Sequence, residues 1–246
     1  MSVIIKQYFD FNIISDNFSE VMQGFWQTIL LSLIGGFFAL LWGLVLSLIR
    51  QLPGRAFAPL RGLAIAYIDA FRGIPMLLVL LLVSTGLAAL SSDGVIPDFI
   101  GQPTFFGKTS PFWWGIYALV ITYGAYMAEV YRAGLEAVPR GQMEAARSLG
   151  MSHGQAMRRV IVPQAVTKVI PPLLNDFIAL MKDTSLVSVI GFIEVVQAGK
   201  DIQSATFNSS ALTLGAVLFL LTTIPLARIV DKMISGQSSK TQRAIP

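Results

Sequence analysis

The stretch that organises this chain reads VPRGQMEAARSLG and occupies residues 138–150. It is the longest polar interruption in an otherwise apolar sequence. Pro139 can open a short helix there, because its ring fixes φ and the first helical N–H needs no partner. Gly150 is placed to end that helix in a left-handed turn, and Ser152 with Gln155 predicts a capping box for a second helix. We therefore expect two short helices separated by a glycine.

The side chains of this element indicate a docking surface. Glu144 falls early in the first helix, where negative charge suits the positive end of the helix dipole. Ala145 and Ala146 are small helix formers that let another surface approach closely. Arg158 and Arg159 come near the carboxyl end of the second helix. The element is therefore basic, and we expect its two alanines to face a partner.

The order Glu-Ala-Ala, three residues, Gly, and then two branched residues before Pro163 resembles the cytoplasmic EAA loop of ABC importer permeases. The branched positions, usually Ile and Leu in that family, are Val160 and Val162 here. In the family this loop forms a coupling helix that lies in a groove of the ATPase subunit. The resemblance implies that the residues coupling to the ATPase are Glu144, Ala145, Ala146, Leu149 and Gly150. The alternative is a basic hairpin that only fixes orientation through the positive-inside rule.

The composition predicts a membrane protein. Hydrophobic residues make up 54% of the 246 residues and charged residues only 13%, and the mean hydropathy is +0.66. A soluble surface cannot be built from so few charges. The net charge of +4 gives little support for nucleic-acid binding, because the basic residues cluster beside apolar segments rather than in a stripe. Cysteine is absent, which excludes disulfides, cysteine-bound metal and thiol nucleophiles.

Apolar segments of sufficient length predict five membrane spans. Residues 1–23 are too interrupted by charge to span, and they suit a helix lying in the membrane interface. The permease domain covers residues 24–234 and contains the coupling loop, residues 139–163, while residues 235–246 form a polar cytoplasmic tail. The expected spans are residues 25–48, 63–90, 113–131, 171–190 and 211–229.

Individual residues add detail to the expected spans. Pro75 predicts a break or kink in the second span, and Pro225 is a kink candidate in the fifth. Lys6 stands alone near the amino terminus, which therefore lacks the basic region of a cleavable signal peptide, and we expect the first span to remain. The small residues that allow close helix contact in the first span are Gly35, Gly36, Ala39 and Gly43.

Charge asymmetry orients the bundle. The arginines after the first span, those of the loop at residues 139–163 and the cations of the tail share one side. Acidic residues dominate the other side, in the amino-terminal segment and before the fifth span. The positive-inside rule places the coupling loop and the carboxyl terminus in the cytoplasm and the amino terminus outside, which requires an odd number of spans.

Three further stretches resemble polar amino-acid uptake permeases in particular, the family that carries histidine, glutamine, glutamate or arginine. AEVYRAG at residues 128–134 matches that family's run into the coupling loop, and KDTSL at residues 182–186 matches a further signature. RGIP at residues 72–75 matches its Arg-Gly-Thr-Pro turn, with Ile74 where Thr is usual. The resemblance covers most of residues 24–230. It implies an all-α membrane protein with the five-helix fold of a type I ABC importer permease and cytoplasmic coupling helices.

Two segments depart from that pattern. The loop at residues 91–112 differs from the usual one, and the apolar run at residues 76–83 lacks the polar and aromatic residues common there. These departures leave open whether this subunit binds substrate itself. Glu129 and Arg132, near the membrane edge, suit a structural role.

The fourth expected span carries a polar stripe. Asp176 and Asp183 lie seven residues apart, as do Asn175 and Lys182, so each pair shares one face of a helix. Charges inside spans are costly and usually face the bundle interior or water. The stripe either lines a translocation path or holds the bundle together through ion pairs, and both interpretations stay open.

Taken with the resemblance, these features predict the transmembrane subunit of an ATP-driven importer for a polar amino acid. The segment from Gly101 to Thr109 has five residues where a phosphate-binding loop has four between its glycines, so this chain is not expected to be an enzyme. The resemblance implies two separate ABC ATPase subunits, a second permease subunit that is identical or homologous, and an external amino-acid-binding protein. It also implies a location in the bacterial cytoplasmic membrane, with the lipid bilayer as surroundings and no cofactor, metal or nucleic acid.

Other functions make different demands on the sequence. A permease for another small polar solute would look much the same. A secondary transporter driven by an ion gradient should show inverted repeats and paired broken helices, and we find no internal repeat. An intramembrane enzyme needs a convergent nucleophile and base, to which a chain without cysteine and with His153 as its single histidine is poorly suited.

Overall fold

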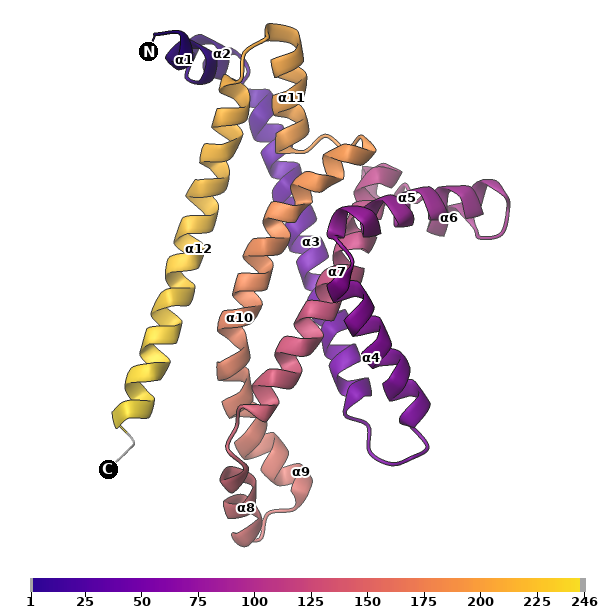
Figure 1. Cartoon of the computed structure of the whole chain (residues 1–246), viewed down its shortest axis with the longest axis vertical. Coiled ribbons are helices and arrows are strands. Elements are labelled where there is room, and N and C mark those ends of the chain that lie inside the picture. Colours follow the sequence, from indigo (N-terminus) through magenta and orange to yellow (C-terminus); the bar gives the residue numbers. More distant parts are fainter. Residues whose placement is uncertain (1, 244–246) are drawn as a thin grey trace.

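The computed structural model describes residues 2–243, and every regular element within them is helical. Four long helices make up the body of the molecule, with shorter helices at both ends and a lateral arm (Figure 1). The all-α prediction is confirmed. The long helices are α3 (Phe18–Arg50), α7 (Ser110–Glu136), α10 (Val162–Asp183) and α12 (Ser210–Arg243).

Close contact between α3 and α7 depends on glycine. A Cβ atom on Gly43 would lie 2.8 Å from the Cβ of Met127 and 2.9 Å from the carbonyl oxygen of Gly124. A Cβ atom on Gly124 would lie 2.6 Å from the ring of Trp42. Because neither side chain could be accommodated without movement, the two backbones approach only as glycines. The small-residue face predicted for the first span is confirmed, since its four members are buried.

The second expected span is broken rather than straight. Helix α4 (Ala58–Gly73) and helix α5 (Met76–Ser92) meet at an angle of 110°. Ile74 is extended, with φ −90° and ψ 130°, because a residue before proline is disfavoured in the helical region. The predicted break at Pro75 is confirmed. Helix α5 leads into the lateral arm (Figure 1).

The arm and the amino terminus contain short helices. The arm carries α6 (Asp98–Gly101) and the turn η1 (Phe105–Gly107). At the amino terminus, α1 (Ser2–Tyr8) and α2 (Phe11–Asp16) precede α3, which begins at Phe18 and not at residue 25 as expected. Asp10 caps α2, since its Oδ1 accepts the backbone N–H of Asn12 at 3.0 Å.

The helix that carries the fourth expected span begins earlier than predicted. Helix α10 starts at Val162, and both Pro171 and Pro172, expected to open it, lie inside it. Two prolines remove two backbone hydrogen bonds, but contacts with α7, α3 and α12 keep the helix continuous. After α10 come the turn η3 (Thr184–Ile190) and helix α11 (Val195–Thr206). The last helix passes through Pro225 and continues into the segment expected as a polar tail.

Helix α11 is fastened to α3 through a buried carboxylate. Glu194 is fully buried, and its two oxygens accept the backbone N–H groups of Val196 and Gln197, each at 2.9 Å. The hydroxyl of Thr28 donates to the same carboxylate at 3.5 Å. Burial raises the pKa of Glu194 to about 7, against the effect of these hydrogen bonds. The cap therefore ties the turn after η3 to the start of the first long helix.

Two phenylalanines adopt a left-handed backbone conformation, Phe106 with φ 54° and Phe207 with φ 53°. Both side chains are among the most exposed, at 90% and 85%. The left-handed region costs a residue with a Cβ atom about 1–2 kcal/mol. Each therefore occupies a position where glycine or asparagine is the usual residue.

Length and apolarity identify fewer spans than predicted. Among the described residues, two helices, α3 and α12, are long and apolar enough to cross a membrane, or three spans result if α4 and α5 count as one broken span. Helices α7 and α10 fall short of that test, so five spans remain a prediction.

Candidate functional site

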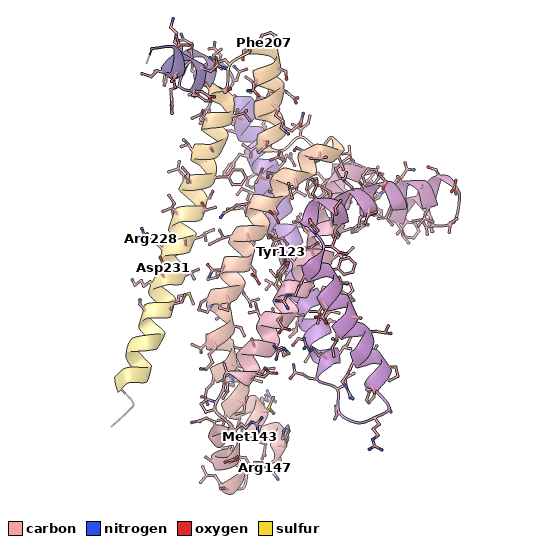
Figure 2. The ribbon with its side chains drawn as sticks, viewed as in Figure 1. Tyr123, Met143, Arg147, Phe207, Arg228 and Asp231 are labelled. Atoms are coloured by element: carbon pink, nitrogen blue, oxygen red, sulfur yellow. The ribbon has the colours of Figure 1, made fainter. Side chains whose placement is uncertain are left out.

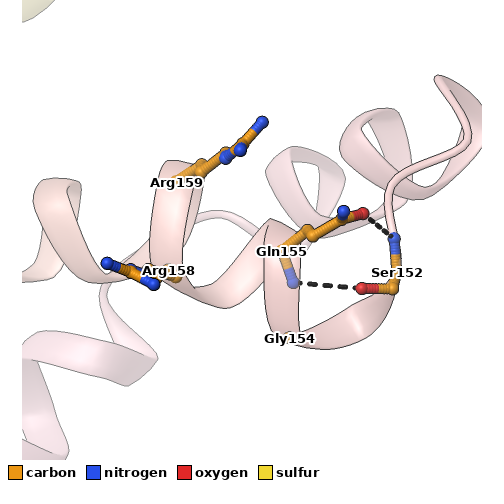
Figure 3. Close-up of a pocket in the computed structure, with 5 residues that line it drawn as sticks. All are labelled: Ser152, Gly154, Gln155, Arg158 and Arg159. Carbon is orange, nitrogen blue, oxygen red and sulfur yellow. Dashed lines mark hydrogen bonds between the residues drawn. The ribbon is translucent and has the colours of Figure 1, made fainter.

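The loop between α7 and α10 has the predicted local structure. Helix α8 (Arg140–Ser148) is followed by Leu149 and then by Gly150, which has φ 81°, as predicted for a left-handed stop. Ser152 caps the short helix α9 (His153–Ala156): its hydroxyl accepts the N–H of Gln155 at 3.3 Å, and its own N–H donates to the Gln155 side chain at 2.9 Å. The predicted capping box is confirmed (Figure 3).

Three details of this loop differ from expectation. Pro139 is the residue before α8 rather than its first residue, with ψ 133°. Glu144 lies beyond the first turn of α8, so the proposed interaction with the helix dipole is wrong. Arg158 and Arg159 lie in the π-helical turn η2 (Met157–Ile161), which runs directly into α10. The second short helix is thus continuous along the chain with α10, through η2.

The two faces of α8 differ sharply. Ala146 is 4% exposed and belongs to the protein's own interior, so the expectation that both alanines face a partner is wrong for Ala146. Glu144 and Ala145 are exposed, and Leu149 is exposed to 81%. The residues expected to couple are therefore divided into an exposed set, which is available to a partner, and Ala146, which fixes how α8 sits.

A basic groove lies beside this helix. Its lining is Ser152, Gly154, Gln155, Arg158 and Arg159, and Figure 3 shows the two guanidinium groups pointing away from each other. Both arginines are exposed, and neither forms an ion pair within the part of the chain that the structure describes. A partner with acidic groups would be attracted to this surface.

A second candidate site lies where α4 and α5 meet. The break brings its own residues against the middle of α7 and the end of α10. Tyr123 lies at the centre of the bundle (Figure 2). The pocket is lined by Arg72, Gly73, Ile74, Pro75, Met76, Thr122, Tyr123, Tyr126, Asp176, Ala179 and Asp183.

Hydrogen bonds and charged side chains define the chemistry of this pocket. The hydroxyl of Tyr123 donates to Oδ2 of Asp183 at 2.9 Å. The guanidinium of Arg72 lies 5.8 Å from the ring centroid of Tyr126, whose hydroxyl donates to the Arg72 carbonyl at 3.2 Å. The pocket thus offers a cationic side chain and carboxylates, Asp176 among them, to a small polar molecule.

Two buried polar atoms in the pocket lack partners within the described residues. They are Oδ2 of Asp176 and Oγ1 of Thr122. A buried polar atom without a hydrogen bond is costly, and both atoms belong to residues that line the same pocket. Both atoms are closed to solvent in this state, so a donor from outside reaches them only when the pocket opens.

The polar stripe of α10 is divided by the fold. Asp176 and Asp183 line the pocket, whereas Asn175 and Lys182 are exposed and do not. Sequence reasoning missed the partners from α4 and α7. The available signal was Arg72 in an apolar run; for the hydroxyl groups of α7, no sequence feature indicated that they face α10.

A cluster of ion pairs joins α3 to α7 on the side of the coupling loop. Arg50 contacts Glu129 at 2.7 Å, and Arg132 bridges Glu129 and Glu136 on the same helix. These contacts agree with the structural role expected for Glu129 and Arg132.

Comparison with known proteins places the chain in a class. Residues 43–236 match the family described as "Binding-protein-dependent transport system inner membrane component". A probable glutamine ABC transporter permease protein, GlnM of Bacillus subtilis, is 36% identical over 219 residues, covering 88% of this chain and 92% of that protein. The arginine transport system permease protein ArtQ of the same organism is 31% identical over 199 residues, covering 81% and 83%.

Solved structures of ABC transporters are also similar to this chain. The crystal structure of an amino acid ABC transporter with histidines is similar with a TM-score of 0.76 and 34% identity, covering 89% of this chain and 94% of that one. The MetNI methionine ABC transporter in an inward-facing conformation matches at 20% identity with a TM-score of 0.69, which supports the fold alone.

The fold is that of a type I ABC importer permease, as predicted. The chain belongs to the family of binding-protein-dependent transport system inner membrane components. It is a permease subunit, and a multi-pass protein of the bacterial inner membrane. Transporters of this kind work with an ATPase and a binding protein.

Proposed function

We propose that this chain forms the translocation path for a polar amino acid, delivered by an external binding protein and driven by ATP hydrolysis in a separate ATPase. The observation that carries the proposal is the pocket at the break between α4 and α5. It combines a guanidinium group with two carboxylates at the middle of the bundle. The relatives' transport of glutamine and arginine, stated in their names, supports the same substrate class.

The pocket suits the two charges that every amino acid carries. Arg72 can bind the α-carboxylate, because a guanidinium group donates paired hydrogen bonds to a carboxylate. Asp176 has a buried oxygen without a partner and can accept a hydrogen bond from the α-ammonium group. Asp183 is held by Tyr123 and adds a second carboxylate to the pocket. Asn175 and Lys182 remain candidates for the path only where it widens beyond the pocket.

Coupling to the ATPase would occur through α8. Its exposed residues Glu144, Ala145 and Leu149 offer a small, partly apolar surface next to the basic groove. Ala146 and Gly150 set the angle of that surface. Because α9 continues through η2 into α10, a displacement of the loop would move the helix that carries Asp176. Coupling requires that the loop contact the ATPase differently in two states.

The assembly we propose contains two ATPases and two permeases, the second permease being identical or homologous. The amino terminus lies outside and the carboxyl terminus in the cytoplasm, with five spans. Charge distribution supports this orientation, since the basic residues gather around the coupling loop. A permease for another small polar solute is the alternative, because the pocket's charges would also suit other zwitterions. A secondary transporter is less well supported, since the family works with an ATPase.

The test is a screen of amino acids against the assembled importer in liposomes. We expect ATP hydrolysis to rise several-fold only when the binding protein and one or a few polar amino acids are both present. Hydrolysis that responds to no amino acid but does respond to another polar solute would contradict the proposed substrate class.

A further inference from the structure

The amino-terminal helix and the turn between α11 and α12 are joined into one unit. They lie next to each other at one end of the molecule (Figure 1). Backbone and side-chain hydrogen bonds cross between them in both directions, over 200 residues of sequence separation. The bonds are Gln7 Nε2 to Phe207 O (3.1 Å), Asn208 Nδ2 to Lys6 O (2.8 Å), Ser209 N to Gln7 O (2.9 Å) and Asp10 N to Ser210 Oγ (2.8 Å).

Phe207 holds an unusual position in this unit. It follows α11 with φ 53° and ψ 28°, and its N–H donates to the Gln203 carbonyl at 2.8 Å. This left-handed cap is a position that glycine fills without strain. The side chain is nevertheless a phenylalanine, 85% exposed at the outermost end of the molecule (Figure 2). A strained backbone that presents an exposed aromatic ring indicates a contact outside the chain.

The amino-terminal segment that is hydrogen-bonded to the Phe207 turn has few charged residues and many exposed apolar ones. Lys6 is the only cation among residues 3–11, and Asp10 the only acid. Helix α3 also has exposed apolar side chains near its start, Phe18 (50%) and Trp26 (58%), and the exposed acids Asp16 and Glu20 precede or accompany them in sequence. The exposed members of α1 and the segment after it are Val3 (77%), Ile4 (64%), Ile5 (54%), Tyr8 (47%), Phe9 (60%) and Phe11 (78%).

We propose that residues 3–11 and Phe207 form one membrane anchor, termed the outer anchor, which lies in the headgroup region of the outer leaflet. Aromatic and aliphatic side chains with few charges are typical of that region. The exposed Phe18 and Trp26 near the start of α3, which face lipid if that helix spans, favour lipid over a protein partner. The hydrogen bonds make the anchor rigid, so that it fixes the level of α3, α11 and α12 in the bilayer.

Spin labels at single cysteines test the outer anchor directly, because the chain has no native cysteine. Phe207→Cys and Tyr8→Cys are labelled with a nitroxide in the complete importer, reconstituted in vesicles of phosphatidylethanolamine and phosphatidylglycerol. Ser204→Cys is the matched control, since Ser204 is exposed on the same helix one turn earlier. Collision rates with oxygen, which partitions into lipid, are compared with those of a water-soluble nickel complex.

We expect the oxygen-to-nickel ratio at positions 207 and 8 to exceed that at position 204 several-fold. An equal ratio at positions 207 and 204 would overturn the outer anchor. A label at 207 that is reached by nickel until the binding protein is added would overturn it in favour of a protein-docking surface. The side from which an impermeant reductant quenches the label reports orientation separately, so a lipid-exposed label on the cytoplasmic side would contradict the proposed topology while supporting the anchor.

Two substitutions separate the anchor from a purely local cap. Phe207→Asn removes the ring and suits a left-handed backbone, whereas Phe207→Trp keeps an interfacial side chain. We expect Phe207→Asn to keep or raise the melting temperature in detergent and to lower it in lipid nanodiscs, with Phe207→Trp unchanged in nanodiscs. If Phe207→Asn shifts the melting temperature in the same direction in detergent and in nanodiscs, the ring has no contact with lipid and the proposal is wrong.

Discussion

At Asp176 a buried carboxylate oxygen has no hydrogen-bond partner within the described residues. The same pocket contains the guanidinium of Arg72 and the Tyr123–Asp183 hydrogen bond. A purely structural carboxylate would be expected to be satisfied by its neighbours, as Glu194 is. The contrast supports a role for Asp176 in binding a ligand transiently.

We therefore predict that Asp176→Asn reduces uptake at low substrate concentration by about tenfold or more, because a hydrogen bond to a charged group contributes about 1.5–3 kcal/mol. Assembly with the ATPase should be unchanged. The measurement is the concentration dependence of uptake, with Asp201→Asn as the control, since Asp201 is exposed on α11 and lies outside the pocket. Unchanged uptake in Asp176→Asn would remove this residue from the path.

Gly150 carries a second residue-scale prediction. Its φ of 81° is unfavourable for any residue with a Cβ atom, although the space around it is open. Gly150→Val should therefore strain the backbone and bend the exit of α8, which reduces co-purification of the ATPase. The control is Gly62→Val, where space is equally open and φ is ordinary. Equal ATPase recovery in both variants would show that the turn does not position the loop.

At the scale of elements, some features could be predicted from the sequence and others could not. The capping box, the glycine stop and the break at Pro75 were predictable, because each depends on residues within a few positions of one another. The start of α10 was not: two prolines suggested a helix start, but packing from three neighbours carries the helix through them. The pocket was half predicted, because the stripe on α10 is local whereas its partners Arg72 and Tyr123 meet it only in the fold.

The two alanines of α8 provide an element-scale test. Ala145 is exposed and Ala146 is buried. The same substitution to leucine should therefore impair the transporter in a different way at each position. Ala146→Leu should overpack the interior, at a cost of about 1–3 kcal/mol, and lower the melting temperature of the isolated permease. Ala145→Leu should leave that temperature unchanged and reduce ATPase association. Equal behaviour of the two variants would contradict the division of α8 into an inner and a partner-facing side.

The arrangement of the whole molecule links its two candidate sites. The coupling loop and the pocket lie at different levels of the bundle, and α10 runs between them without a break after η2. Helix α7 likewise carries pocket residues at its middle and leads into the loop at its end. Both connections are helices, which transmit displacement along their length. In the topology we propose, this end, with its basic residues, faces the cytoplasm.

Single cysteines test that orientation. Ser152→Cys, in the exposed groove, should react with an impermeant thiol reagent only from the cytoplasmic side, whereas Ser92→Cys, at the end of α5, should react only from outside. The absence of native cysteine removes background labelling. Labelling of Ser152→Cys from outside intact cells would exclude the five-span topology.

The most direct test of ATP-driven import is uptake of a radiolabelled amino acid by proteoliposomes that contain this permease, its ATPase and the binding protein. We predict uptake against a concentration gradient that requires ATP and the binding protein. The same uptake should fall in Ala145→Leu, although the assembled permease remains folded. Uptake that proceeds without ATP and follows an imposed ion gradient would contradict the proposed mechanism.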